Sequence, residues 1–267
     1  MARRLTAIAT LIATAVVLAG CGGGGDRANV TTGAVSTGAH APSGSGSRPS
    51  KSRPLTRAQA IAFAHAVNLT SADLPGFTAS SQREHTTPAG KRLEHEVLRC
   101  TGSSPSGGDQ LVEVGSERFK LGHSPINFAV SSEVSVARGS SRTSRELTRV
   151  GGNRARACLS HYLNLLFREE LLKELGHRAI ARAISTSISI SHGTPPSPGA
   201  RGGFGWRIVA TVTIHNVRLP FYFDILGFVY GPAEVSLESS GSLRPFPAKA
   251  QEHLYLLLLK RAETHGV

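Results

Sequence analysis

The chain has 267 residues, of which 40% are hydrophobic, so it is long enough to bury a substantial core. Its formal net charge is +12, and its 30 Lys and Arg residues are scattered rather than grouped into a basic helix with interleaved aromatic residues. This distribution argues against a nucleic-acid partner. The basic surface instead favours association with anionic lipid head groups or wall polymers.

The first twenty residues have the pattern of an export signal. Arg3 and Arg4 precede an apolar run over 5–18, and the run ends in Leu18-Ala19-Gly20-Cys21, which resembles a bacterial lipobox. The run is shorter than the roughly 20 apolar residues of a transmembrane helix, and its basic start and small-residue end are typical of a cleaved signal. We therefore predict a lipoprotein signal peptide over 1–20. Cys21 is the expected lipidation site, for example with palmitate, which anchors the chain on the extracytoplasmic side of the cell membrane.

Residues 21–53 contain the lipidated cysteine and a segment of mainly Gly, Ser, Thr, Ala and Pro. Such a segment has too few large apolar side chains for a core, so we predict a disordered, flexible linker. One globular domain is then expected over 54–267. Because its cysteines, Cys100 and Cys158, lie outside the cytoplasm in this reading, we expect them to form a structural disulfide.

The first half of the domain is predicted to combine helices with a hairpin. Thr56 and Gln59 have the spacing of a capping box, so a helix should start there and end near Asn68. Hydrophobic periodicity and turn residues then predict the following elements in order: a capped turn over 71–77, a helix over 89–99, and strands over 111–120 and 126–138 that turn around 122–125.

The second half is predicted to be a helix followed by a meander. Its elements are a short helix over 144–150, the main core helix over 154–175, strands over 179–191, 204–215, 221–230 and 233–237, and a closing helix over 247–262. The apolar stripe of the core helix is expected at Cys158, Tyr162, Leu165, Leu166 and Leu172. From Ile184 to Ile190, serine alternates with isoleucine or threonine, which is the period of a half-buried strand. Consecutive strands joined by short turns indicate an α+β fold, with an antiparallel sheet of about five to six strands packed against helices.

This order of elements, together with Asn68-Leu69 and Asp73-Leu74-Pro75-Gly76-Phe77 after the first helix, resembles a group of actinobacterial proteins. The group comprises sensor-like lipoproteins and the extracellular sensor domains of PknH-type kinases, within the wider PsbP-like fold group. The resemblance implies a cleft between the sheet and the helices that binds envelope ligands without catalysis.

Asp224 is the candidate functional residue that stands out, because it interrupts an apolar strand. A buried carboxylate is unfavourable unless it is paired. One interpretation is structural: Asp224 pairs with an arginine of a neighbouring strand, such as Arg207 or Arg182. The other interpretation is a polar anchor in a ligand-binding cleft, since such clefts combine apolar walls with a few polar groups. The aromatic residues expected to line that cleft are Tyr222, Phe228 and Trp206.

The sequence contains no pattern that predicts catalytic residues, a metal site or a cofactor. The string nearest to a Gly-x-Ser-x-Gly nucleophile turn is Ser43–Ser47, which has serines at both glycine positions and lies in the linker. Glu94, His95 and Glu96 are adjacent, and adjacent positions on a helix point in different directions, so they cannot close on one metal ion.

We therefore expect a membrane-anchored envelope lipoprotein with a non-enzymatic, sensor-like domain that binds a ligand or an envelope protein. Two alternatives stay open at this point. A carrier of a lipid or glycolipid would require an enclosed apolar cavity. An envelope hydrolase would require a serine or paired carboxylates to converge with a histidine in a cleft.

Overall fold

The computed structural model describes most of the second half of the chain and parts of the first. The described residues are 55–80, 92, 95–96, 99–100, 110–123, 125–138, 156–165, 167, 184–193, 195, 202–214 and 216–266. The predicted signal peptide, Cys21, the linker and the short helix over 144–150 lie outside them. Among the described residues, no helix is both long and apolar enough to cross a membrane.

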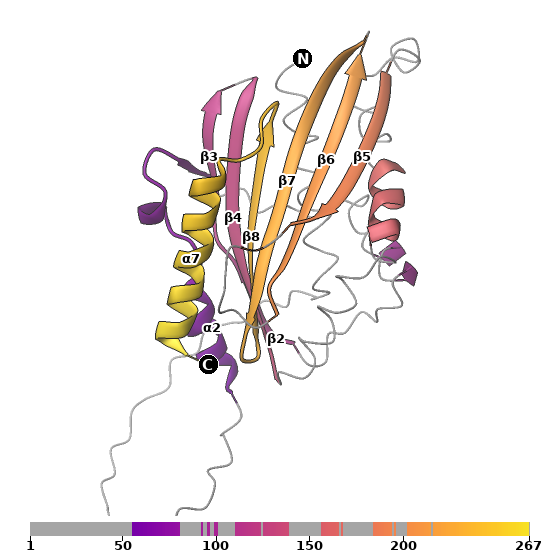
Figure 1. Ribbon diagram of the computed structural model, residues 1–267. Helices are drawn as coiled ribbons and strands as arrows, with labels where there is room; N and C mark the ends of the chain where they lie inside the picture. The colour runs from indigo at the N-terminus through magenta and orange to yellow at the C-terminus, as the bar shows by residue number, and fades with distance from the viewer. Residues whose placement is uncertain are drawn as a thin grey trace, which may run out of the picture.

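The fold is α+β, as predicted, and is built on one antiparallel sheet (Figure 1). The sheet has eight strands, in the order β1-β3-β4-β8-β7-β6-β5, with β2 also pairing with β4. The strands are β1 (Thr78–Ser80), β2 (Gln110–Gly115), β3 (Arg118–His123), β4 (Ile126–Ala137), β5 (Ile184–His192), β6 (Phe204–Ile214), β7 (Val217–Tyr230) and β8 (Ala233–Ser242).

The sheet is larger than the five to six strands predicted, for two local reasons. The stretch expected to be one strand over 111–120 is broken between β2 and β3, and both strands pair with the long strand β4. At the break, the Ser116 hydroxyl donates to the backbone oxygen of Glu117 at 2.7 Å and accepts the Ser132 N–H at 2.9 Å. The additional strand β1 has three residues, which is too short to produce a recognisable alternation.

The helices α2 (Arg57–Val67) and α7 (Ala248–His265) pack on the same side of the sheet. The capping box of Thr56 and Gln59 starts α2, as predicted. Helix α2 contacts β2 and β4, α7 contacts β7 and β8, and the two helices contact each other. The core between the helices and the sheet contains Phe63, Leu74, Val134, Val235, Leu237, Phe228, Tyr255 and Leu258.

A buried polar junction joins the end of α2 to the sheet. The Asn68 amide donates to the backbone oxygen of Val114 at 2.7 Å, and its side-chain oxygen accepts the Ser132 hydroxyl at 2.7 Å. The Leu69 N–H donates to the same hydroxyl at 2.9 Å. Asn68 and Ser132 are both buried, so these bonds satisfy polar groups that would otherwise lie unpaired in the core.

The short 3-10 helix η1 (Ser71–Asp73) is tied to α7 by an ion pair. Arg261 donates from Nη2 to Oδ1 of Asp73 at 2.7 Å and from Nη1 to Oδ2 at 2.9 Å. The Thr70 N–H donates to Oδ2 at 2.7 Å. Burial by itself raises the pKa of Asp73, but the bonds from Arg261 and Thr70 outweigh it and leave that pKa below its ordinary value.

This lowered pKa predicts a loss of stability in acid. A carboxyl whose pKa is lower in the folded state stabilises the fold above its unfolded-state pKa, and that stabilisation disappears as the pH falls through the folded-state pKa. We expect Asp73→Asn to lower the free energy of unfolding by about 2 kcal/mol at pH 7, with a smaller difference from the wild type below pH about 4. Urea unfolding between pH 3 and 7 measures this difference. Glu263→Gln, on the exposed side of α7, is the control, and an Asp73→Asn deficit of equal size at every pH would contradict the prediction.

The helical residues 156–165 and 167 lie within the core helix predicted over 154–175. Their buried side chains are Cys158, Leu159, Leu163 and Phe167, whereas Leu165, which was expected in the core, is 52% exposed. Cys158 is therefore buried as predicted, and Leu159, Leu163 and Phe167, at spacings of four residues, form the buried stripe in place of Leu165. Cys100 and Cys158 lie at disulfide-bonding distance, with Cα atoms 6.0 Å apart.

Candidate functional site

The register of the strands shows which side chains share a face of the sheet. Asp224 lies directly opposite Arg207 on β6 and Ser239 on β8. Ser239 accepts a 2.6 Å hydrogen bond from Gln251 of α7, so all three side chains lie on the side of the sheet that carries the helices. Trp206 lies opposite Ile225, and its side chain therefore projects from the other side.

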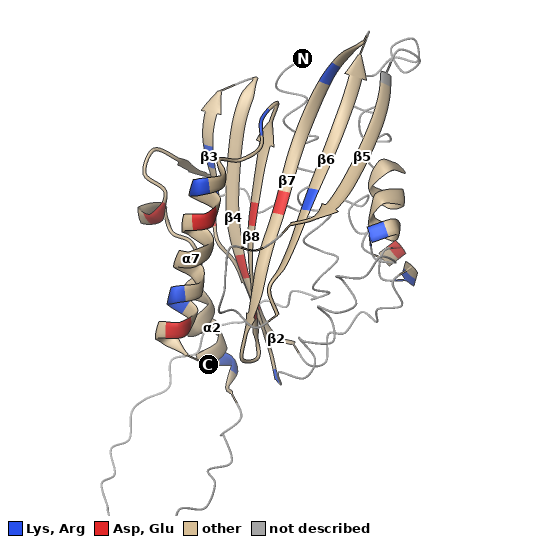
Figure 2. Ribbon diagram, in the orientation of Figure 1, with Lys and Arg blue, Asp and Glu red and all other residues tan. Residues whose placement is uncertain are grey.

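Asp224 and Arg207 form an ion pair through two parallel hydrogen bonds. Arg207 donates from Nε to Oδ1 at 2.6 Å and from Nη2 to Oδ2 at 2.9 Å. In Figure 2, a red segment of β7 lies beside a blue segment of β6 at this pair. The hydrogen bond and the charge of Asp224 raise the pKa of Arg207 against the opposing effect of burial, so the guanidinium stays charged.

The pair lies at the boundary between the core and solvent. The Asp224 side chain is 4% exposed, whereas the Arg207 side chain is 42% exposed. Arg207 is one of the two partners that the sequence suggested, and the other, Arg182, lies outside the described residues. Arg207 is therefore the cation that the buried carboxylate of Asp224 requires. Its guanidinium extends from this carboxylate to the surface.

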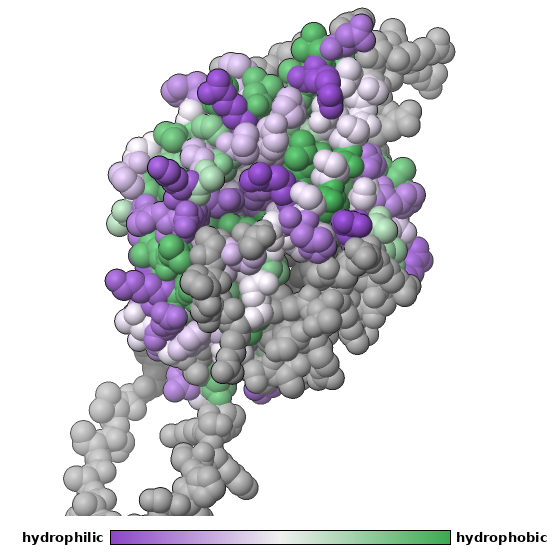
Figure 3. Space-filling model, in the orientation of Figure 1, coloured by the Kyte–Doolittle hydropathy of each residue, from purple (hydrophilic) through white to green (hydrophobic). Residues whose placement is uncertain are grey.

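Beside the pair, a partly exposed surface extends across β5, β6 and β7. We call it the serine–arginine face, and it comprises Ser185, Ser187, Ser189, Ser191, Arg207, Val209 and Tyr222. The four serines are exposed, and Val209 and Tyr222 are half-buried. Figure 3 shows this side of the molecule, where apolar and weakly polar residues mix over these strands. The face combines hydroxyls, one aromatic ring and a cation next to the helices.

The predicted ligand-lining residues are not all brought together. Tyr222 and Asp224 share the helix side of the sheet, but Phe228 is fully buried in the core with its ring 5.5 Å from that of Tyr255. Trp206 lies on the opposite side, 4% exposed, with its ring 4.4 Å from that of His192. The sequence reasoning missed the serines as site residues, although the alternation over 184–190 already placed them on one face of a strand.

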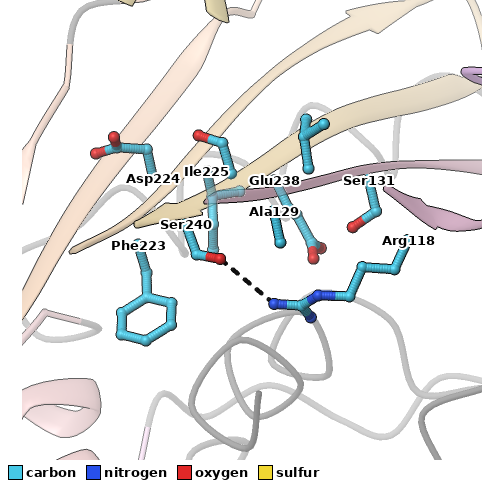
Figure 4. A pocket seen from close by; sticks show the side chains of 10 residues that line it. Arg118, Ala129, Ser131, Phe223, Asp224, Ile225, Glu238 and Ser240 are labelled. Carbon is cyan, nitrogen blue, oxygen red and sulfur yellow. Dashed lines mark hydrogen bonds between the residues drawn. The ribbon is translucent and has the colours of Figure 1, made fainter. Parts of the chain in front are cut away.

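A small cavity lies on the side of the sheet opposite α2 and α7. Its lining includes Arg118, Phe223, Glu238 and Ser240, and Arg118 donates to the Ser240 hydroxyl at 3.4 Å. In Figure 4 the Asp224 side chain points away from Phe223 and Arg118. The cavity volume of about 10 Å³ is room for roughly one water molecule and not for an acyl chain.

Glutamates gather near this cavity around Glu133 of β4. Burial is the main cause that raises the pKa of Glu133 well above its ordinary value, and the charges of Glu113, Glu238 and Glu234 raise it further. The register explains the proximity, because Glu133 lies between Gly115 of β2 and Ser236 of β8, with the other glutamates at diagonal positions. At neutral pH, ionised Glu133 is therefore unfavourable for the fold.

Neutralising this residue is expected to stabilise the protein. A carboxyl whose pKa is higher in the folded state favours the fold below its unfolded-state pKa, and this advantage is lost as the pH rises through the folded-state pKa. We expect Glu133→Gln to raise the free energy of unfolding by about 1 kcal/mol at pH 8 and to have little effect at pH 4. Chemical unfolding at both pH values tests this, with the exposed Glu117→Gln as control. A destabilised Glu133→Gln variant at pH 8 would disprove the expectation.

Within the described residues, no three His, Cys, Asp or Glu side chains are arranged to hold a metal ion. Of the three adjacent residues considered above as metal ligands, His95 and Glu96 belong to the described residues and Glu94 does not.

Comparisons with known proteins give one structural similarity. No protein-family model matches the chain, and no curated protein matches it. Among solved structures, the extracellular domain of PknH from Mycobacterium tuberculosis is similar over 79% of this chain and 98% of that chain, at 9% sequence identity and a TM-score of 0.30. A TM-score of 0.30 is too low to transfer topology or function, so the candidate site rests on the contacts described above.

Proposed function

We propose that the chain is a lipid-anchored protein of the cell envelope whose domain binds a ligand or a partner, without catalysis, through the serine–arginine face. The anchoring part of this proposal comes from the sequence, where the apolar run ends in Leu18-Ala19-Gly20-Cys21. The binding part comes from the site, where a charged side chain, hydroxyls and a half-buried tyrosine share one accessible surface.

The position of Arg207 is the observation that carries the proposal. A salt bridge that served stability alone could be buried completely, but here the carboxylate is buried while 42% of the arginine side chain stays exposed. Helices α2 and α7 contact β2, β4, β7 and β8, and the serines of β5 beside Arg207 stay exposed. The result is a surface with oriented polar groups, as binding sites require.

The anchoring is tested through Cys21. We expect the chain, expressed in an exporting bacterium fed with labelled palmitate, to incorporate the label and to fractionate with membranes. Cys21→Ala should abolish the label, because the thiol is the acceptor. The matched control is Cys158→Ala, which removes a thiol from the domain and should leave the label in place. Equal labelling of the Cys21→Ala chain would disprove lipidation at this position.

The binding surface is tested by photo-crosslinking in intact cells. A photoreactive phenylalanine analogue replaces Ser189 on the serine–arginine face or, as the control, Glu252 on the exposed side of α7. The proposal expects an adduct from position 189 and none from position 252. The same adduct from both positions, or none from position 189, would show that this face is not the binding surface.

A further inference from the structure

The guanidinium of Arg207 has two edges that can form paired hydrogen bonds, and Asp224 occupies one of them. A guanidinium carries five N–H donors in a rigid plane. Asp224 accepts from Nε and from one N–H of Nη2. One N–H of Nη1 and the second N–H of Nη2 form the other, outer edge of the fork, and Asp224 does not occupy it. Among the described residues, Arg207 forms its ion pair and its side-chain hydrogen bonds with Asp224.

The buried carboxylate fixes the direction of that outer edge. Asp224 is 4% exposed and holds Arg207 side-on, so the outer edge of the guanidinium is turned away from this carboxylate, and 42% of the arginine side chain is exposed. An arginine held in this way loses little rotamer freedom when it binds a second oxyanion, and its fork matches the geometry of phosphate and carboxylate oxygens. The geometry is that of a preorganised anion anchor.

A row of hydroxyls extends from the anchor along β5. Ser191 lies directly opposite Arg207, and the exposed serines continue at every second residue to Ser185, about 20 Å away. At the far end, Ser185 lies opposite Thr213, and Thr213 lies opposite the exposed Arg218. Among the described residues on this side of β5, β6 and β7, Asp224 is the one with an acidic side chain. Its charge is balanced by Arg207.

We propose that the serine–arginine face binds an anionic glycan, with Arg207 holding a phosphate or carboxylate group and the serine row contacting the sugar hydroxyls. The proposal rests on the proposed function and names its ligand class. The charge is complementary, because Arg207, Arg218 at the far end of the serine row, and the net charge of +12 attract a polyanion. The extended row of small hydroxyls matches a chain that carries many hydrogen-bonding groups and little apolar surface.

The test measures binding of sugar probes to the full chain in mild detergent by saturation-transfer NMR. The probes are glucose 6-phosphate, glucuronate, an oligomer of glucuronate, and uncharged glucose. We expect the anionic probes to bind at least about tenfold more tightly than glucose, a difference of about 1.4 kcal/mol. Tighter binding of the phosphate or of the carboxylate monosaccharide identifies the anion, and tighter binding of the oligomer than of glucuronate supports the serine row. Equal binding of glucose and the anionic sugars would overturn the proposal.

Variants assign the binding to the face. Arg207→Lys keeps the charge but loses the fork, and we expect about a tenfold loss of affinity for the anionic probes. Ser189→Ala and Ser191→Ala change exposed side chains and should not disturb folding. They therefore test the proposal even if Arg207→Lys fails to fold, and each should weaken binding of the oligomer severalfold. Arg57→Ala removes an exposed charge from α2 and is the control. Unchanged affinity in all three face variants would overturn the proposal.

Two further outcomes separate this inference from the proposed function. An adduct at position 189 in cells, together with no binding of any anionic sugar, would overturn the glycan assignment and leave the binding surface in place. Absence of that adduct would count against the surface itself. Arg207-dependent binding to phosphatidylglycerol vesicles, without binding to the sugars, would assign the anchor to lipid head groups and would also overturn the glycan proposal.

Discussion

Removing the link between Cys100 and Cys158 is expected to lower the free energy of unfolding by about 4 kcal/mol. The two cysteines are 58 positions apart in sequence, and their Cα atoms are 6.0 Å apart. A covalent link across that separation restricts the unfolded chain far more than the folded one, so its loss favours unfolding. For a domain of this size, we expect the midpoint of thermal unfolding to fall by about 8 to 16 °C.

Urea unfolding of the full chain in mild detergent, with and without reductant, measures this effect. The Cys100→Ser, Cys158→Ser double variant should resemble the reduced wild-type chain and should not respond to reductant. A single Cys100→Ser variant leaves Cys158 buried as a free thiol, and we expect it to be as unstable as the double variant. If reduction changes the unfolding free energy by less than about 1 kcal/mol, a stabilising disulfide between these residues is ruled out.

Replacing Arg207 with methionine is expected to destabilise the fold by about 3 kcal/mol at pH 7, because it leaves Asp224 buried without a cation. The value is set at the low end for buried pairs, since the Arg207 side chain is 42% exposed and the pair is partly screened by solvent. Methionine keeps much of the packing of the arginine stem, so the loss measures mainly the unpaired charge.

A double variant distinguishes an unpaired charge from lost packing. Asp224→Asn instead leaves an arginine that can turn into solvent, and we expect a loss of about 1 kcal/mol. The Asp224→Asn, Arg207→Met double variant should be more stable at pH 7 than Arg207→Met alone. A double variant less stable than Arg207→Met would contradict the account of an uncompensated carboxylate.

The local elements of this protein were largely predictable, because they depend on residues close together in sequence. The capping box of Thr56 and Gln59 and the alternation in Ile184 to Ile190 both correspond to observed elements. The break at Ser116 was not predictable, because it depends on hydrogen bonds to Ser132, sixteen residues away. Without that contact, the stretch 111–120 has the pattern of a single strand, so the predicted number of strands was too low.

The candidate site was predictable only in part. Asp224 stood out because a carboxylate in an apolar strand needs a partner, and that argument requires no knowledge of the fold. The structure does not bring Tyr222, Phe228 and Trp206 together, because Phe228 is buried against Tyr255 of α7 and the register of β6 on β7 places Trp206 on the other side of the sheet. The serine row was not recognisable as a binding site from the sequence, since only the pairing of β5 with β6 places Arg207 beside it.

The sequence by itself determined the basic character of the chain, the export signal ending at Cys21 as a prediction, the α+β class, and the need of Asp224 for a cation. These follow from composition, from periods of two and 3.6 residues, and from the unfavourable burial of charge. Only the tertiary structure decided that Arg207 is that cation, that Ser191 lies beside it, and that α7 packs on β7 and β8 and leaves the serines of β5 exposed. Pairing between strands is set by contacts between residues far apart in the chain, and no local pattern contains that information.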